Sequence, residues 1–390
     1  MQLGPVASRA PSAPAKINLW SSSRSIPVIY ASRRVSAIDM KSRASALGCT
    51  VLVADIGGTN CRFQLWELDT YLRPAVMSLE QIYQTSSYDR FDQALEAFLA
   101  TEAATSSPPQ AAAFACAGPV RKQRCEFTNL GWVVDADEVA KKFKLRSRVL
   151  NDFEAVGYGV PALGEHDILV LNDVPAEEKG PKAVLGPGTG LGEAQLFWDD
   201  SINNYKVYAS EGSHATFAPR GWKQRALQAR VEAERGHCSV ERVACGSGLV
   251  RIYDFLHSDE VSNRPGVKRI LDPTPADVSI AAMSGDDPVA SEALDILLAI
   301  VGAEASHMAL RSLSSGGVYI AGGILPKVVD RVRQGGVLEA FLWKASRFHD
   351  KVLKDTPLYV VLEERVGLIG SREQAIQLVQ MAQDDVYIST

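Results

Sequence analysis

The sequence is poor in cysteine and lacks any long apolar run. Its 390 residues include six cysteines, which form no C-x-x-C pair and no cluster with histidine at the spacing of a zinc site. Sparse, scattered cysteines are typical of reduced structural thiols and argue against a small disulfide-stapled domain. No uninterrupted apolar stretch approaches the ~20 residues that a membrane-spanning helix needs. We therefore expect no membrane partner, and a chain of this length favours two globular domains.

Acidic residues are nearly absent from the first 48 positions. This segment holds one acid, Asp39, beside seven basic residues and ten serines, and it has no sustained apolar periodicity. Such a composition is typical of an organelle transit peptide, and a disordered tail is the alternative. The abundance of serine favours the plastid (chloroplast) stroma, with a mitochondrial or cytoplasmic location as the alternatives.

Acidic residues outnumber basic ones, by contrast, in the remainder of the chain. The formal net charge is −5 for the whole sequence and +6 for residues 1–48, so the remainder carries −11. Binding to nucleic acid depends on dense lysine and arginine surfaces. The acidic body therefore argues against a nucleic acid partner.

Strand-like and helix-like patterns alternate along this acidic body. Apolar residues at 91, 95, 98 and 99 predict an amphipathic helix, and a second helix is expected over 288–311, with Asp287 and Pro288 as its cap and first turn. Short apolar runs predict buried strands at 50–54, 111–117, 148–150, 182–185, 194–198, 317–323 and 357–362. This alternation predicts an α/β fold with central, partly parallel sheets.

Two common nucleotide-binding loops are missing. The P-loop pattern G-x-x-x-x-G-K-[ST] is absent, and the glycines of GPGTGLG recur every second residue rather than as G-x-G-x-x-G. Instead, three glycine-rich turns each follow an expected strand, at 55–60 (DIGGTN), 186–192 (GPGTGLG) and 321–324 (AGGI). Glycine lets successive backbone N–H groups converge on an anion. One such turn is more often a plain chain reversal, but three in this context predict phosphate binding.

Two acids lie at strand ends near these turns. Asp55 would repel a bare phosphate, so its position suggests an intervening Mg²⁺ held through water, unless it is a turn aspartate bonded to its own backbone. Asp152 is suited to accept the proton of a hydroxyl that attacks a phosphate, with Asn151 orienting that hydroxyl. Taken alone, however, an Asn-Asp pair before a helix is more often a helix cap.

A further polar group lies in the segment Glu211-Gly-Ser-His214. Glutamate accepts hydrogen bonds from two hydroxyl groups and histidine donates one, which suits a polyhydroxy ligand. Glu241 is a candidate for a further acceptor. The alternatives are a solvated surface loop for Glu211 and His214 and a solvated helix face for Glu241.

Taken in order, these motifs resemble bacterial-type glucokinase, the non-ROK branch of the sugar kinase, Hsp70 and actin superfamily. The resemblance spans residues 50–385 and lies in five segments. VADIGGTNCRFQL is similar to the family's first phosphate motif, FTNLGW with VLNDFEAV to its sugar segment, VLGPGTGLG to its second phosphate motif, GGVYIAGGILPK to its adenosine motif and LEERVGLIGS to its closing segment.

The resemblance implies an α/β, two-domain actin-like ATPase (ribonuclease H-like) fold with the active site in the interdomain cleft. A small α/β domain would comprise residues 49–162 and 372–390, and a large α+β domain residues 163–371. The implied activity is the transfer of the terminal phosphate of ATP to the 6-hydroxyl of D-glucose, with Mg²⁺ as cofactor and a homodimer as the assembly.

The resemblance also implies a role for each motif residue. Asp152 would be the catalytic base, and Asn151, Asp152, Glu211, His214 and Glu241 would bind the sugar. ATP would be bound by residues of the three glycine-rich turns: Ala54, Asp55, Ile56, Gly57, Gly58, Thr59, Asn60, Gly188, Thr189, Gly190, Gly322 and Gly323. Asp55 would reach Mg²⁺ through water.

The sequence departs from the family pattern at two positions. Ser213 replaces the second glycine of Glu-Gly-Gly-His, which adds a small side chain beside the sugar pocket, and Glu154 replaces a smaller residue. The zinc-binding cysteines of ROK kinases are absent, so no structural metal is expected. Three alternatives remain open: a kinase of another hexose or amino sugar, a catalytically silent sugar sensor, and an actin-like or Hsp70-like ATPase.

Overall fold

The computed structural model describes residues 47–127, 129–258, 268–343 and 347–388. The predicted transit peptide lies outside the described residues, apart from its last two positions, where the first strand begins. The division of the body into two domains stays a prediction. Its proposed boundary between residues 371 and 372 lies within one continuous helix, α13 (Val366–Ile388).

Five strands form the first sheet, in the order β3-β2-β1-β4-β8. β1 and β2 form an antiparallel hairpin, whereas β4 runs parallel to β1 and β8 runs parallel to β4. Because Asp55 lies opposite Ala115 and Cys116 lies opposite Asn151, the carboxyl ends of the parallel strands meet at one edge. The strands are β1 (Leu47–Ile56), β2 (Asn60–Asp69), β3 (Pro74–Gln84), β4 (Ala111–Cys116) and β8 (Arg146–Asn151).

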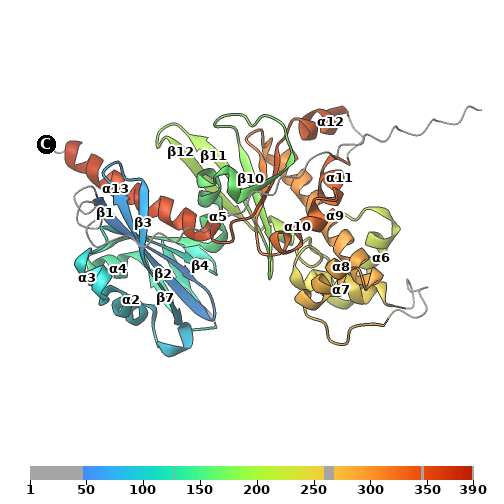
Figure 1. Ribbon diagram of the computed structural model, residues 1–390, viewed down its shortest axis with the longest axis horizontal. Coiled ribbons are helices and arrows are strands. Elements are labelled where there is room, and N and C mark those ends of the chain that lie inside the picture. The colour runs from blue at the N-terminus through green and yellow to red at the C-terminus, as the bar shows by residue number, and fades with distance from the viewer. Residues whose placement is uncertain (1–46, 128, 259–267, 344–346, 389–390) are drawn as a thin grey trace, which may run out of the picture. The chain divides into compact units, whose positions relative to one another are not determined.

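Both faces of the first sheet are covered, which explains the alanine-rich sequence of β4. Successive side chains of a strand point to opposite faces. Ala112 and Phe114 pack with the apolar residues of α2 (Phe91–Leu99), and Ala111 and Ala113 pack with those of α13. Figure 1 shows α13 running beside β1. A strand buried on both faces is apolar throughout instead of alternating.

Six strands form the second sheet, in the order β12-β11-β10-β13-β14-β9. β10, β13 and β14 run parallel, and the other three are antiparallel to their neighbours. The turn Gly188–Gly190 closes the hairpin between β10 and β11, and Gly322 follows the neighbouring strand β13. The strands are β9 (Ile168–Asn172), β10 (Lys182–Pro187), β11 (Leu191–Asp199), β12 (Asn204–Ser210), β13 (Val318–Ile320) and β14 (Leu358–Val361).

Helix α5 (Asp152–Gly159) contacts strands of both sheets as well as α13. Glycines allow this close packing. A Cβ atom on Gly192 would lie 2.3 Å from the ring of Phe153, and one on Gly370 would lie 1.8 Å from the carbonyl oxygen of Ala155. The position of α5, which begins at Asp152, therefore depends on glycines in strand β11 and helix α13.

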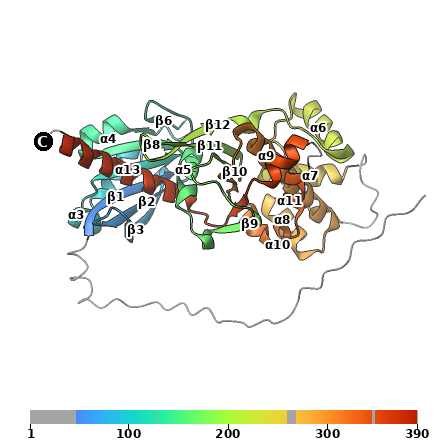
Figure 2. The same ribbon diagram turned by 90° about the horizontal axis from the view of Figure 1, so that it is seen from above.

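The largest apolar core surrounds α9 (Pro288–Ser312), and Figure 2 shows α9 beside α7, α8 and α11. By length and composition α9 is apolar enough to cross a membrane, but 72% of its apolar window is buried within the structure. Core packing therefore accounts for its composition. The helices of this region are α6 (Gly221–Arg235), α7 (Gly246–Leu256), α8 (Pro275–Ser284), α9, α10 (Val329–Val332), α11 (Gly336–Leu342) and α12 (Arg347–Lys354).

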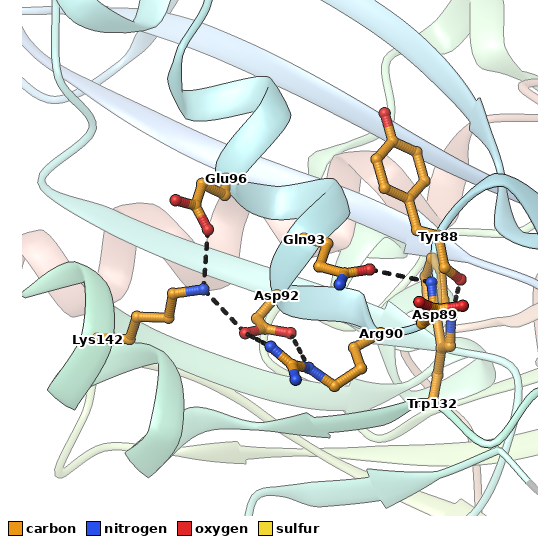
Figure 3. A network of polar contacts seen from close by, with 8 residues as sticks. All are labelled: Tyr88, Asp89, Arg90, Asp92, Gln93, Glu96, Trp132 and Lys142. Atoms are coloured by element: carbon orange, nitrogen blue, oxygen red, sulfur yellow. Dashed lines mark hydrogen bonds and ion pairs between the residues drawn. The ribbon is translucent and has the colours of Figure 1, made fainter.

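Polar contacts tie α2 to α4 (Ala136–Phe143) on the outer side of the first sheet (Figure 3). Lys142 Nζ lies 2.9 Å from carboxylate oxygens of both Asp92 and Glu96, and Arg90 also binds Asp92. Such exposed ion pairs contribute only about 0–1 kcal/mol each. Nearby are α3 (Glu102–Ser106) and a small sheet of β5 (Val120–Arg121), β6 (Arg124–Glu126) and β7 (Val133–Asp135).

The predicted strands and helices are confirmed, with shifts at their ends. The helix over 91–99 is α2, the helix over 288–311 is α9, and the Asp287 carboxylate accepts hydrogen bonds from the N–H groups of Val289 and Ala290. The strand predicted at 317–323 is shorter, Val318–Ile320, because Gly317 and Gly322 at its flanks have positive φ angles of 108° and 86°.

Candidate active site

Two adjoining pockets lie between the carboxyl edges of the two sheets. One has a volume of about 540 Å³ and is lined by the turns at 188–190 and 322–323, Glu241 and Asp152. The other has a volume of about 710 Å³ and is lined by Asp55, Arg62 and Asp152 among others. Both pockets are lined by Asp152, Val156, Glu363 and Glu364, so they form one cleft.

Asp152 lies at the centre of this cleft, at the first position of α5. One carboxylate oxygen accepts a hydrogen bond of 2.9 Å from the N–H of Phe153. Asp152 is exposed to the cleft, but the surrounding protein partly desolvates its carboxyl group and so raises the pKa of Asp152. The Phe153 N–H opposes the shift, while the negative charge of Asp55 adds to it. A carboxylate with a raised pKa is the better proton acceptor.

Asn151 is the N-cap of α5. Its side-chain oxygen accepts hydrogen bonds from the N–H groups of Phe153 and Glu154, and its amide nitrogen donates to the carbonyl oxygen of Gly118 at 3.1 Å. The interpretation of Asn-Asp as a helix cap is therefore confirmed. An amide nitrogen has two hydrogens, so this arrangement leaves room for a sugar contact.

The three expected sugar ligands away from α5 lie close together. His214 Nε2 is 3.5 Å from Glu211 Oε2, and His214 Nδ1 is 3.9 Å from Glu241 Oε1. Glu241 is anchored by the N–H of Leu191, which donates to its Oε2 at 3.0 Å. Glu241 also lines the cleft together with Asp152. The fold thus brings Asp152 and Glu241 together, although they are 89 positions apart in the sequence.

The second and third glycine-rich turns have an evident reason for glycine. A Cβ atom on Gly190 would lie 2.7 Å from Glu241 Oε2. Gly322 has a φ of 86°, and a Cβ there would lie 2.5 Å from the carbonyl oxygen of Pro187. Any side chain at either position would crowd the turn against the cleft wall.

The first glycine-rich turn closes the hairpin of β1 and β2, with the N–H of Gly57 bonded to the carbonyl oxygen of Asn60 at 2.9 Å. Ala54 and Ile56 are fully buried and line neither pocket, so their predicted contact with ATP stays a prediction. Among the described residues, Gly57, Gly58, Thr59 and Asn60 lie outside the lining of both pockets. Their proposed contact with ATP stays a prediction.

Asp55 lies at the end of β1, in the larger pocket. Burial raises the pKa of its carboxyl group, and the positive charge of Arg62 opposes that shift. The cleft lining gathers further acids, Glu363 and Glu364, around Asp152. Carboxylates that line a cleft in this way repel the phosphates of a nucleoside triphosphate unless a cation lies between them. A site whose donors are all oxygens suits Mg²⁺.

Five charged residues that line the cleft were not among the predicted site residues: Arg62, Lys327, Glu363, Glu364 and Arg365. Glu363 and Glu364 follow β14, so two adjacent acids at a strand end were the available signal. Lys327 comes four positions after the third glycine pair, and its Nζ is 4.0 Å from the Cβ position of Gly323.

Comparison with known proteins agrees with this geometry. The family model described as Glucokinase matches residues 52–378. A glucokinase of Synechocystis sp. is 34% identical over 357 residues, covering 85% of this chain and 99% of the relative, and one of Mesorhizobium japonicum is 34% identical, covering 84% and 91%. The crystal structure of a glucokinase from an Antarctic psychrotroph superposes with a TM-score of 0.73 at 28% identity, covering 84% of this chain and 98% of that chain.

Two mixed sheets that meet at a cleft of glycine-rich turns and carboxylates define the actin-like ATPase fold of sugar kinases, as the superposition shows. Within that class the match extends over most of the chain and nearly the whole length of the relatives. The chain belongs to the glucokinase family, in its bacterial-type branch.

Proposed function

We propose that this protein transfers the terminal phosphate of ATP to the 6-hydroxyl of D-glucose, giving glucose 6-phosphate and ADP. The family supplies the class of activity, an ATP-dependent sugar kinase. The observation that carries the proposal is the position of Asp152, in one cleft with two glycine-rich turns and with Glu241 of the sugar cluster.

In this mechanism the oxygen of the sugar 6-hydroxyl bonds to the terminal phosphorus of ATP, and ADP leaves. Asp152 accepts the proton of that hydroxyl. The oxygen of Asp152 that the Phe153 N–H does not bind would take the proton. Glu211, His214 and Glu241 would orient the sugar, and the turns at 188–190 and 322–323 would hold ATP. Phosphoryl transfer depends mainly on such positioning and on neutralisation of charge.

Mg²⁺ would neutralise phosphate charge, and Asp55 is the residue suited to hold it through water. No three His, Cys, Asp or Glu side chains within residues 47–127, 129–258, 268–343 and 347–388 form a ready-made metal site. Mg²⁺ bound with ATP needs none, because it keeps waters and phosphate oxygens as ligands. We expect Asp55→Asn to raise the Mg²⁺ concentration for half-maximal rate about 10-fold or more. An unchanged Mg²⁺ dependence would remove Asp55 from this role.

Glucose is favoured over other sugars because neither departure from the family pattern opens into the cleft. The side chain of Ser213 is 1% exposed. Glu154 lines neither pocket of the cleft. Burial raises the pKa of its carboxyl group, and the positive charge of Arg148 opposes that shift. Kinases of other hexoses or amino sugars remain the second candidate.

The test is product formation by the full chain with Mg·ATP and glucose, run in parallel with galactose, mannose and N-acetylglucosamine. We expect turnover dominated by glucose. Faster turnover of another sugar would reassign the substrate. Glucose binding in calorimetry without product would instead indicate a sugar sensor.

We propose further that residues 1–48 direct the protein to the plastid stroma and that the protein is a homodimer. The basic, serine-rich composition supports the first proposal, together with a family match that begins only at residue 52. A fusion of residues 1–48 to a fluorescent protein should enter isolated chloroplasts, and uptake by mitochondria alone would overturn this. Light scattering of the purified protein at micromolar concentration would settle the dimer.

A further inference from the structure

Glu193 is a buried carboxyl group that the proposed mechanism does not use. It lies near the start of β11, three positions after the turn at 188–190, and only 2% of it is exposed. Its Oε1 has no hydrogen-bond partner among the described residues. Buried carboxyl groups are rare and costly unless they have a partner, so this one calls for an explanation.

The other carboxyl oxygen of Glu193 lies against the backbone of Gly212. A Cβ atom on Gly212 would lie 2.3 Å from Glu193 Oε2 and 2.9 Å from Ser210 Oγ. Gly212 has no positive φ angle, so space rather than backbone conformation demands glycine there. Glu193 is also paired with Ser210 across the β11–β12 ladder, and Ser210 Oγ accepts the N–H of Gly212 at 2.8 Å.

Gly212 stands between the two sugar ligands Glu211 and His214. The same end of β11 also supports the third ligand, because the N–H of Leu191 binds Glu241. The N–H of Glu241 in turn donates to the carbonyl oxygen of Ser213 at 3.0 Å. The first residues of β11 therefore connect the phosphate-binding turn to every sugar ligand outside α5.

The charged groups around Glu193 come mainly from α9. Glu304 is 3% exposed and bound at 2.9 Å by both His307 and Arg311. Burial raises the pKa of Glu193 to about 7, the negative charge of Glu304 contributes in the same sense, and Arg311 opposes it. Arg220, which precedes α6, also acts on Glu304.

We propose that Glu193 is a positioning residue for the sugar site: its carboxyl group supports Gly212 and thereby holds Glu211 and His214 in place. This inference rests on the proposed function of the same site. It predicts a dependence on pH with a definite sign. Below about pH 7 the neutral carboxyl group fits its buried place. Above that pH the carboxyl group is ionised, lies near the negative charge of Glu304 and has no partner for Oε1. The packing of Glu193 against Gly212 then becomes unfavourable, so sugar affinity falls.

The first test compares the wild type with Glu193→Gln, a neutral side chain of the same shape, between pH 6 and pH 8. Glucose affinity is measured by calorimetry and by KM at saturating Mg·ATP. We expect the ratio of wild-type to variant KM for glucose to rise about tenfold over this range, the change that one pKa unit of coupling produces. The corresponding ratio of KM values for ATP should not change with pH. The ratio cancels any contribution from His214, which both proteins share.

The second test places a methyl group against the carboxyl group. Gly212→Ala should raise KM for glucose at least tenfold while kcat changes less, because the ligands are displaced rather than removed. The increase in KM caused by Gly212→Ala should be much smaller in a Glu193→Ala background, because that change removes the carboxyl group next to Gly212. Gly336→Ala is the matched control, because a Cβ there meets nothing within 4 Å.

The outcomes separate this inference from the proposed function. A chain that neither binds nor phosphorylates glucose would overturn both. A chain that phosphorylates glucose, but whose KM ratio does not change with pH and whose Gly212→Ala loss is equal in both backgrounds, would overturn the positioning role alone. Melting temperatures of the variants at pH 6 identify any loss that comes from unfolding.

Discussion

Asp152, the proposed catalytic base, is also the first residue of helix α5. Its backbone begins α5 behind the cap of Asn151, and one of its carboxylate oxygens accepts a hydrogen bond from the N–H of Phe153. This fixes the carboxylate in the cleft before any ligand arrives. A base held in this way needs little rearrangement during the reaction.

We expect Asp152→Asn to lower kcat about 10²–10⁴-fold, the usual contribution of a positioned base. The amide keeps the shape, so the variant should fold and bind glucose in calorimetry. Asp137→Asn is the matched control, an exposed aspartate in the first turn of α4. A variant at Asp152 with near-normal kcat would show that another group accepts the proton.

The raised pKa of Asp152 also predicts the acid limb of the pH–rate profile. A base acts in its ionised form, so kcat/KM must fall as the pH drops through that pKa. Because burial raises it, the limb should lie above the ordinary aspartate value of about 3.9. A limb at or below that value, measured in the free enzyme, would contradict the electrostatic assignment.

At the scale of elements, α5 depends on glycines in its neighbours. Gly370 of α13 allows the two helices to approach until its Cβ position is 1.8 Å from the carbonyl oxygen of Ala155. The carbonyl oxygen of Ala155 belongs to the backbone of α5, so it cannot move aside as the end of a flexible side chain can. The position of Asp152 is thus set partly by a glycine more than 200 residues away in the sequence.

Gly370→Ala should therefore lower the free energy of unfolding by about 1–3 kcal/mol, the usual cost of overpacking. It should also lower kcat, because α5 shifts. Gly367→Ala in the same helix is the control, because its nearest contact would be an ordinary 3.7 Å to Val156. Urea unfolding compares them, and equal stability of the two variants would refute the close-packing interpretation.

At the scale of the whole molecule, Glu193 links stability to pH. The folded protein holds the proton of Glu193 up to about pH 7, whereas the ordinary pKa is 4.5. The folded state thus binds more protons between these values, so stability must fall as the pH rises through this window. Burial alone would raise the pKa of Glu304, but its bonds to His307 and Arg311 lower it overall. Glu304 therefore changes the stability only below its ordinary pKa of 4.5.

We expect the free energy of unfolding of the wild type to decrease by about 3 kcal/mol from pH 4.5 to above pH 7 through this group. Glu193→Gln should lack that decrease and be the more stable protein at pH 8. Urea unfolding of both proteins across the range measures the difference. Parallel curves for the two proteins would contradict it.

Much of the fold and part of the site followed from local sequence. The double glycine after β1, the alternate glycines after β10 and the cap at Asp287 are short-range signals, because turn and cap chemistry depends on neighbouring residues. The family resemblance rested on the same segments. Glu363 and Glu364 were missed although they are adjacent acids at a strand end, because nothing local shows which strand ends meet at the cleft.

The sequence by itself determined the strands and helices, their glycine-rich turns and the family, since each depends on residues close together in the chain. Only the tertiary structure decided which strand ends and turns lie next to one another. The parallel pairing of β1, β4 and β8 brings Asp55 beside Asp152, and packing of η5 (Gly212–His214) on β11 places Glu193 beneath Gly212. Such contacts depend on register and space between distant segments, which no local pattern records.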